Sequence, residues 1–258
     1  MVTGVHPGER LLFPSAGRDL IAYRYVPAPG VGGGDRGGPV PAVVLNHGSG
    51  LEQDSKPGVA RVLTDAGYVV FVPFRRGYAG SPGPSRLEEV PAPAGAPGHD
   101  EQVCARLLAE SDDVLAALRF VRAMPGVDPA RVGVMGSSYG GINSLLAAAR
   151  DGRLRACVSF AAAAMSWGPV PGLRPFLLRH VDTIRCPLLL LQAENDFDTS
   201  PSEALAARRR AADGVCERHL FPPFGASPIE AHQIWVHAPN LWAPVVLPFL
   251  ARYVQGRA

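Results

Sequence analysis

Two adjacent serines lie between glycines near the middle of the chain, in the stretch RVGVMGSSYGG (residues 131–141). The pattern G-x-S-x-G fits this stretch in only one register, with Gly136 and Gly140 on either side of Ser138. In that pattern the serine occupies a sharp turn between a strand and a helix, which exposes its hydroxyl above a sheet. Glycine at the two flanking positions removes Cβ atoms that would clash in so strained a turn. Ser138 is therefore the candidate nucleophile, and Ser137 is interpreted as a small residue that fits the turn.

The context of the motif carries more weight than the motif itself, because a chain with 29 glycines can match so short a pattern by chance. The preceding RVGVM is typical of a strand, and the following INSLLAAAR is typical of a helix. The serine would then lie at a helix N-terminus, where the helix dipole favours developing negative charge.

A serine hydroxyl is a weak nucleophile unless a base takes its proton. With this kind of turn, an acid and then a histidine follow the serine along the chain, each on a loop after a strand. The acid candidates are Glu194, Asp196 and Asp198, which follow the apolar run PLLLLQ. Asp196 has the better position to reach an imidazole from the strand end. Asp198 is the alternative acid or caps the next helix, and Glu194 is interpreted as part of the loop.

The base is expected on the loop after the last strand-like run, and His232 lies there, ahead of the predicted C-terminal helix. The other six histidines lack this context. We therefore assign His232 as the candidate base.

An oxyanion formed by attack on an acyl carbon needs two backbone N–H donors. One is expected from Tyr139, the residue after the nucleophile. The other is expected from Ser49 in the stretch LNHGSG (residues 45–50), where Gly48 lets the backbone turn tightly. His47 in the same stretch is interpreted as a hydrogen-bonding brace of the loop.

These side chains can come together only if one sheet places the ends of the strands before them at the same edge. Two N-terminal runs, residues 9–14 and 19–26, predict an antiparallel hairpin. Nearly continuous apolar runs predict buried parallel strands at 42–46, 68–74, 131–135, 156–160, 187–192 and 216–221. Helical patterns lie at 58–67, 109–124, 140–150, 201–213 and 240–254. This alternation predicts an α/β doubly wound sheet, which we interpret as a single domain over residues 1–258.

Three segments are irregular. The Gly/Pro-rich residues 27–41 predict a mobile surface loop. Residues 81–100 are dense in proline and glycine and are either a lid or binding segment or a surface insertion. The connection 161–184 is short, and within it Met165 and Trp167 either line a pocket or pack under the loop.

Composition excludes several classes of protein. The net charge of +2 is too small to indicate a nucleic-acid partner, and we interpret the run Arg208–Arg210 as a solvated helix face. No apolar run approaches the roughly 20 residues of a membrane span, and the N-terminus lacks the apolar core of a signal peptide, so a cytoplasmic location is expected. The four cysteines lack C-x-x-C spacing and are interpreted as buried free thiols, with a disulfide or a catalytic cysteine as the alternatives.

Together, the stretches NHGSG (46–50), PFRRGYAGSPG (73–83), GVMGSSYGG (133–141), LLLQAENDFDTSP (189–201) and FGASPIEAH (224–232) resemble the dienelactone hydrolase-like branch of the α/β-hydrolases. The resemblance extends over almost the whole chain. It implies an eight-stranded, mostly parallel sheet, a triad of Ser138, Asp196 and His232, no metal and no organic cofactor.

The chain departs from the family pattern at the nucleophile, where the namesake enzymes have cysteine and this chain has serine. A serine fits general esterase chemistry better than hydrolysis of dienelactone itself. Arg75 and Arg76 follow a strand and could face the site, but the favoured interpretation is that they brace the loop by pairing with acidic residues.

The expected function is hydrolysis of a small-molecule carboxylic ester or lactone, with acyl groups of small or medium size because the connection 161–184 leaves room for only a small cap. Neither nucleic acid nor a membrane is an expected partner. A prolyl-oligopeptidase-like peptidase and an acyltransferase are alternatives within the enzymes. A non-catalytic binding protein of the same fold is the alternative outside them.

Overall fold

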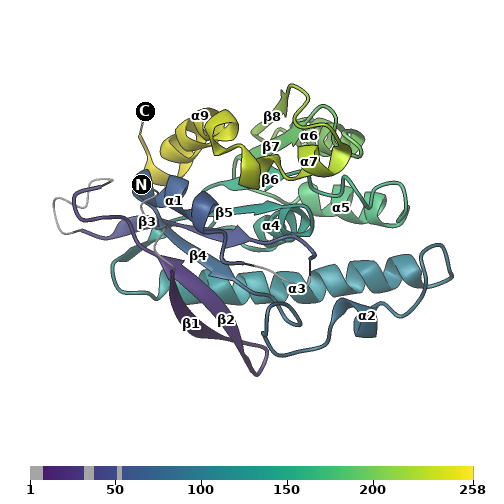
Figure 1. Cartoon of the computed structure of the whole chain (residues 1–258), viewed down its shortest axis with the longest axis horizontal. Coiled ribbons are helices and arrows are strands. Elements are labelled where there is room, and N and C mark those ends of the chain that lie inside the picture. Colours follow the sequence, from purple (N-terminus) through teal and green to yellow (C-terminus); the bar gives the residue numbers. More distant parts are fainter. Residues whose placement is uncertain (1–7, 32–37, 51–53, 258) are drawn as a thin grey trace.

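The computed structural model describes residues 8–31, 38–50 and 54–257, and within them eight strands form one sheet (Figure 1). The strands are β1 (Glu9–Ser15), β2 (Arg18–Tyr25), β3 (Val40–Asn46), β4 (Val69–Pro73), β5 (Val127–Ser137), β6 (Cys157–Phe160), β7 (Leu188–Ala193) and β8 (Cys216–Phe221). Their spatial order is β1-β2-β4-β3-β5-β6-β7-β8. Strand β2 is antiparallel to β1 and β4, and every other neighbouring pair is parallel. The predicted N-terminal hairpin and mostly parallel sheet are thus confirmed. Residues 32–37 of the predicted loop 27–41 lie outside the described residues.

Helices cover both faces of this sheet. They are α1 (Pro57–Asp65), α2 (Arg86–Glu89), α3 (His99–Arg122), α4 (Tyr139–Arg150), α5 (Leu173–Val181), α6 (Ser200–Ala211), α7 (Pro228–His232), α8 (Ile234–His237), α9 (Pro239–Leu250) and the π-helical turn η2 (Ala251–Gln255). One core cluster takes side chains from α3, α4, α5 and α6. The other takes side chains from α1, α7, α8, α9 and η2. In Figure 1 the long teal α3 and the yellow α9 lie on opposite sides of the strands.

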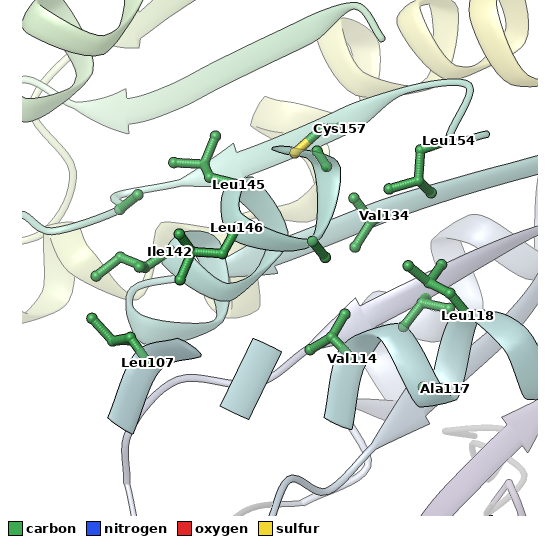
Figure 2. Close-up of a cluster of buried hydrophobic side chains, with 14 of the residues drawn as sticks. Leu107, Val114, Ala117, Leu118, Val134, Ile142, Leu145, Leu146, Leu154 and Cys157 are labelled. Carbon is green, nitrogen blue, oxygen red and sulfur yellow. The ribbon is translucent and has the colours of Figure 1, made fainter. Parts of the chain in front are cut away.

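The inner strands β3, β4, β6 and β7 are mostly apolar because both of their faces are buried. In β3, Ala42 and Val44 belong to the first cluster, whereas Val43 and Leu45 belong to the second. Figure 2 shows the first cluster, where α3 and α4 face each other and the strands β5 and β6. Its labelled members are Leu107, Val114, Ala117, Leu118, Val134, Ile142, Leu145, Leu146, Leu154 and Cys157. Such packing makes the sheet a rigid base for the loops at its edges.

The parallel strands bring the predicted site segments to one edge of the sheet. Asn46 at the end of β3 pairs with Gly136 near the end of β5. Ala193 at the end of β7 pairs with Phe221 at the end of β8. Because carboxyl ends of parallel strands lie at the same edge, the segments after β3, β5, β7 and β8 converge there.

Two helices depart from the sequence-based expectation. Helix α3 begins at His99, ten residues before the predicted start at 109, so the irregular segment 81–100 is shorter than expected and also contains α2. The buried face of α3 includes Arg106, Glu110 and Asp113, and these charges hide its amphipathic period. Helix α5 lies inside the segment that was expected to be a simple connection.

The predicted surface role of the arginine run holds for only part of it. Arg208 and Arg210 are exposed, but Arg209 is buried, with 6% of its surface exposed. The interpretation of the whole run as a solvated face is therefore wrong at its middle residue. The four cysteines are free thiols, but only Cys157 and Cys186 are buried, so the expected burial is wrong for Cys104 and Cys216. Over the described ranges, none of the helices is both long enough and apolar enough to cross a bilayer.

Candidate active site

Ser138 occupies a strained turn between β5 and α4. Its backbone has φ 57° and ψ −123°, a conformation that non-glycine residues rarely adopt. Two hydrogen bonds hold it there: its N–H donates to the carbonyl of Phe160 at 2.9 Å, and its carbonyl accepts from the N–H of Ile142 at 3.0 Å. The turn places the side chain outside the strand and at the beginning of a helix, as the motif predicts.

The glycines on either side are required by close approach of the backbone. A Cβ on Gly136 would lie 2.3 Å from the carbonyl oxygen of Gly140. A Cβ on Gly140 would lie 2.2 Å from the carbonyl oxygen of Asn46 and 2.4 Å from that of His47. Gly140 therefore lets the start of α4 pack directly on the end of β3, which brings the two predicted oxyanion segments together.

His232, at the end of α7, contacts Asp196 on the loop after β7. The Nδ1 of His232 lies 2.9 Å from Asp196 Oδ1, and both residues are buried. Asp196 is held by two further donors: the N–H of Phe197 at 2.7 Å from Oδ1 and the amide Nε2 of Gln192 at 3.1 Å from Oδ2. A carboxylate on Nδ1 selects the tautomer that carries its proton on Nδ1. The lone pair is then on Nε2, which is buried and has no hydrogen-bond partner among the described residues.

The other two acid candidates do not contact this histidine through any described hydrogen bond or ion pair. The carboxylate of Asp198 accepts from the N–H of Ser200 at 2.8 Å, at the beginning of α6. Glu194 is exposed on the loop. The structure thus brings Asp196 to His232 and gives Asp198 the helix-end contact considered for it.

A cavity of about 330 Å³ connects the nucleophile, the histidine and one oxyanion candidate. It is lined by Gly48, Ser49, Gly50, Lys56, Ser137, Ser138, Met165, His232, Gln233 and Trp235. The second oxyanion candidate, Tyr139, lines an adjoining cavity of about 170 Å³ together with Ser49, Arg86, Ser138, Ala163, Met165 and Ser166. Ser138, Ser49 and Met165 line both cavities, so the hydroxyl lies where the two compartments meet.

Met165 and Trp167, the predicted pocket residues, occupy different environments. Met165 is 51% exposed and lines both cavities. Trp167 is buried in the core cluster beside α3, α4 and α5, with the guanidinium of Arg174 5.7 Å from its ring centre. Trp167 is absent from the lining of either cavity beside Ser138.

The sequence analysis did not single out several lining residues. Arg86 belongs to the segment 81–100, and its guanidinium lies 5.1 Å from the ring centre of Tyr139, so this segment contributes a wall of the site. Lys56 lines the larger cavity and forms an ion pair with Asp54 at 2.6 Å. The prolines and glycines of 81–100 left both a binding segment and a surface insertion open, and nothing in the sequence indicated which of its side chains would reach inward.

The segment after β3 is held by the side chains predicted to brace it. His47 Nδ1 lies 2.8 Å from the carbonyl oxygen of Gly48, and its Nε2 accepts from the N–H of Arg75 at 3.3 Å. Burial, reinforced by the nearby Arg75 charge, lowers the pKa of His47 well below 6.5, so the ring is neutral at pH 7. Arg75 pairs with Glu110 and Arg76 pairs with Asp113, each at 2.8 Å. The predicted hydrogen bonding of His47 within its loop and the predicted pairing of both arginines with acidic residues are confirmed, and of the two arginines Arg75 is the one that bonds the segment after β3.

No group of three histidine, cysteine, aspartate or glutamate side chains suited to a metal ion occurs within residues 8–31, 38–50 and 54–257.

Comparison with known proteins gives a family and a fold. The family model of the dienelactone hydrolase family matches residues 30–221. A curated relative, thiohydrolase aneE of Aspergillus aculeatus, is 30% identical over 120 residues, which are 46% of this chain and 33% of that protein. The match thus spans about a third of the relative's length.

Two solved structures show the same fold at low sequence identity. Acylaminoacyl peptidase of Pyrococcus horikoshii matches with a TM-score of 0.73 and 16% identity, over 97% of this chain and 42% of that one. Est1E of Butyrivibrio proteoclasticus matches with a TM-score of 0.66 and 17% identity, over 96% and 99% of the two chains. These likenesses establish the α/β-hydrolase fold.

Proposed function

The chain belongs to the dienelactone hydrolase family, a family of hydrolases, and on that premise we propose that it cleaves carboxylic esters, lactones included, with Ser138 as nucleophile. His232 is the general base and Asp196 orients it. One observation carries the proposal. The strained Ser138 shares a cavity with His232, whose Nδ1 is held by Asp196 and whose Nε2 has no partner among the described residues.

In the acylation half-reaction, Ser138 Oγ attacks the acyl carbon while its proton passes to His232 Nε2. The carbonyl oxygen becomes an oxyanion, which the N–H groups of Ser49 and Tyr139 stabilise. Asp196 stabilises the imidazolium that forms. Collapse of the tetrahedral intermediate breaks the bond to the leaving oxygen, which takes the proton from His232, and the acyl group remains esterified to Ser138.

In the deacylation half-reaction, water takes the place of the leaving alcohol. His232 accepts a proton from this water as its oxygen attacks the acyl carbon. The second tetrahedral intermediate collapses, the proton returns to Ser138 Oγ, and the carboxylic acid departs. The enzyme is then in its starting state.

The two cavities differ in their position relative to His232. On this difference we base the assignment of the leaving group to one cavity and of the acyl group to the other. The leaving group must lie within reach of the histidine that protonates it, so the cavity of about 330 Å³ is the leaving-group side. The cavity of about 170 Å³, lined by Tyr139 and Arg86, then holds the acyl group. The smaller volume favours short acyl chains over long ones.

A thioester is the second candidate substrate, because a relative named a thiohydrolase is 30% identical over 120 residues. A thiolate leaves more readily than an alkoxide, because a thiol, with a pKa near 8.5, is a stronger acid than an alcohol. The same nucleophile and base would serve both reactions.

The test is turnover of p-nitrophenyl esters from acetyl to octanoyl, alongside an acyl thioester and an aminoacyl anilide. Ester turnover with an optimum at short chains is expected, and Ser138→Ala should lower kcat by roughly 10³-fold or more. Ser137→Ala, which removes the neighbouring hydroxyl from the same cavity, should keep kcat within several-fold. Undiminished turnover in Ser138→Ala contradicts the proposal, and cleavage of the anilide in preference to the esters favours a peptidase.

A further inference from the structure

We propose that Arg75 is a positioning residue that orients and polarises the Gly48–Ser49 peptide for oxyanion binding, and that Glu110 holds Arg75 in this task. The inference rests on the proposed function, in which the N–H of Ser49 is one of the two oxyanion donors. Neither Arg75 nor Glu110 lines the cavities beside Ser138, so both would act through the backbone.

Arg75 is completely buried, and all three nitrogens of its guanidinium have partners. Nη1 donates to the carbonyl of His47 at 2.8 Å, and Nη2 donates to the carbonyl of Gly48 at 3.0 Å. Nε donates to Glu110 Oε2 at 2.8 Å. Two of the three nitrogens thus hold successive carbonyls of the segment that follows β3.

The bond to Gly48 bears directly on the proposed oxyanion donor. The carbonyl of Gly48 and the N–H of Ser49 are the two ends of one planar peptide unit, so fixing the first fixes the second. This carbonyl also accepts from Nδ1 of the neutral His47 at 2.8 Å. A cationic donor on a carbonyl oxygen draws electron density from its peptide and makes the N–H a stronger donor. Arg75 would therefore both aim and strengthen the Ser49 N–H.

The carboxylate of Glu110, on α3, binds this arginine together with other buried donors. It accepts from Arg75 Nε at 2.8 Å, Arg106 Nε at 2.7 Å and the hydroxyl of Tyr78 at 3.2 Å. Burial opposes ionisation of Glu110, but the charges of Arg75 and Arg106 outweigh it, and its pKa lies below 4.5. The carboxylate is thus ionised at neutral pH and neutralises part of the cationic charge around it.

Glu110 also contacts the helix that begins directly after Ser138. The amide Nδ2 of Asn143 lies 3.0 Å from Glu110 Oε2 and 3.0 Å from the carbonyl oxygen of Tyr139. One buried carboxylate therefore connects the segment after β3, through Arg75, with the first turn of α4, through Asn143.

Stabilisation of the fold does not by itself explain why the Arg75–Glu110 pair is buried here. Desolvating a buried ion pair offsets most of its attraction, and apolar replacements of similar volume are often equally stable. Correct placement of the Ser49 N–H accounts better for a charged pair at this place.

The experiment compares Arg75→Lys with Arg76→Lys in the full chain. A lysine cannot make the three bonds of the guanidinium fork. Arg76 is the matched control, because it is the neighbouring buried arginine but bonds Asp113 and not the segment after β3. For each variant we would measure kcat and KM with a p-nitrophenyl ester. We would also measure the Ki of an alkylboronic acid, whose tetrahedral adduct with serine places a negatively charged oxygen in the oxyanion hole.

Arg75→Lys is expected to lower kcat by about 10- to 100-fold, part of the 10²–10³-fold loss typical when a whole oxyanion donor is removed. KM should change by less than about three-fold, and the boronate Ki should rise by a factor similar to the loss in kcat. Arg76→Lys should leave all three within about three-fold. Glu110→Gln keeps an acceptor for Arg75 but removes the charge. It should also lower kcat and raise the boronate Ki with little change in KM, but by smaller factors than Arg75→Lys.

Boronate affinity that is unchanged in folded Arg75→Lys or Glu110→Gln overturns the inference, as does an equal effect in Arg76→Lys. Failure of the wild type to turn over esters or to bind the boronate overturns the proposed function instead, so the two failures are distinguishable.

Discussion

Asp196 and Asp198 lie two residues apart on one loop, and their carboxylates bind different groups. Asp196 is buried against His232 Nδ1, with Gln192 and the N–H of Phe197 fixing its two oxygens. Asp198 accepts from the first N–H of α6. The proposed mechanism assigns orientation and charge stabilisation of His232 to Asp196 alone.

Replacement of Asp196 by asparagine tests this division of roles. The amide keeps the size of the side chain but removes the charge that stabilises the imidazolium, and it can present an N–H to Nδ1 and so select the wrong tautomer. We expect Asp196→Asn to lower kcat by roughly 10³–10⁴-fold. Asp198→Asn is the matched control and should change kcat by less than about three-fold. Equal losses of ester turnover in the two variants contradict the assignment.

The candidate site residues that the sequence predicts are those whose place follows from a turn or a strand end. Ser138 is identified by its glycines, and Asp196 and His232 by chain order after apolar runs. The residues that hold them are far away in the sequence: Glu110 lies 35 residues from Arg75 and 33 from Asn143. No local pattern marks such a partner, because its role arises only when α3 packs beside α4.

At the scale of elements, the proposed site depends on how closely α4 approaches β3. The first turn of α4 packs against the carbonyls of Asn46 and His47, with no room for a Cβ at Gly140. This contact sets the distance between the N–H groups of Tyr139 and Ser49.

Gly140→Ala is expected to push α4 and β3 apart. Overpacking of a buried contact costs about 1–3 kcal/mol or more, and a change of 1 kcal/mol shifts Tm by roughly 2–4 °C in a domain of this size. We therefore expect Tm to fall by several degrees and kcat to fall more than ten-fold. Gly58→Ala is the matched control: a Cβ there meets nothing within 4 Å, so Tm should be unchanged or slightly higher. Thermal unfolding and ester turnover of both variants check this. A Gly140→Ala protein with the Tm and kcat of the wild type would contradict it.

Most strands were predictable because a strand buried on both faces is a short, nearly continuous apolar run. The start of α3 was not, because its first four residues carry polar side chains and its buried face contains three charged residues that only tertiary contacts neutralise. Helix α5 was missed because glycines and prolines directly precede it and Pro175 lies in its first turn. Hydrophobicity patterns therefore predict the strands of the sheet better than they predict helices with charged residues on their buried faces.

At the scale of the whole molecule, buried charged and titratable groups couple stability to pH. His47 is completely buried and neutral, and its pKa in the folded chain is well below 6.5. In the unfolded chain a histidine titrates near 6.5. Below that pH the unfolded state binds a proton that the folded state does not, so the free energy of unfolding falls as pH decreases.

We expect the wild type to lose stability from about pH 6.5 down to pH 5, with His47 contributing a slope of at most about 1.4 kcal/mol per pH unit. Glu110, with a pKa lowered from 4.5, contributes to pH dependence only at lower pH. Denaturant unfolding at pH 7, 6 and 5 measures the slope. His47→Gln should flatten it, whereas the control His237→Gln, at an exposed position on α8, should not. The same slope in wild type and His47→Gln would rule out His47 as its source.

If Ser138 is the nucleophile, a covalent serine label must attach to it and not to the neighbouring Ser137. The folded protein would be treated with a fluorophosphonate, and the modified residue would be located by tandem mass spectrometry of the peptide that contains both serines. One adduct per chain is expected, on Ser138, that disappears in Ser138→Ala and persists in Ser137→Ala. An adduct on Ser137, or no adduct on a folded protein that hydrolyses esters, would contradict the assignment of Ser138 as nucleophile.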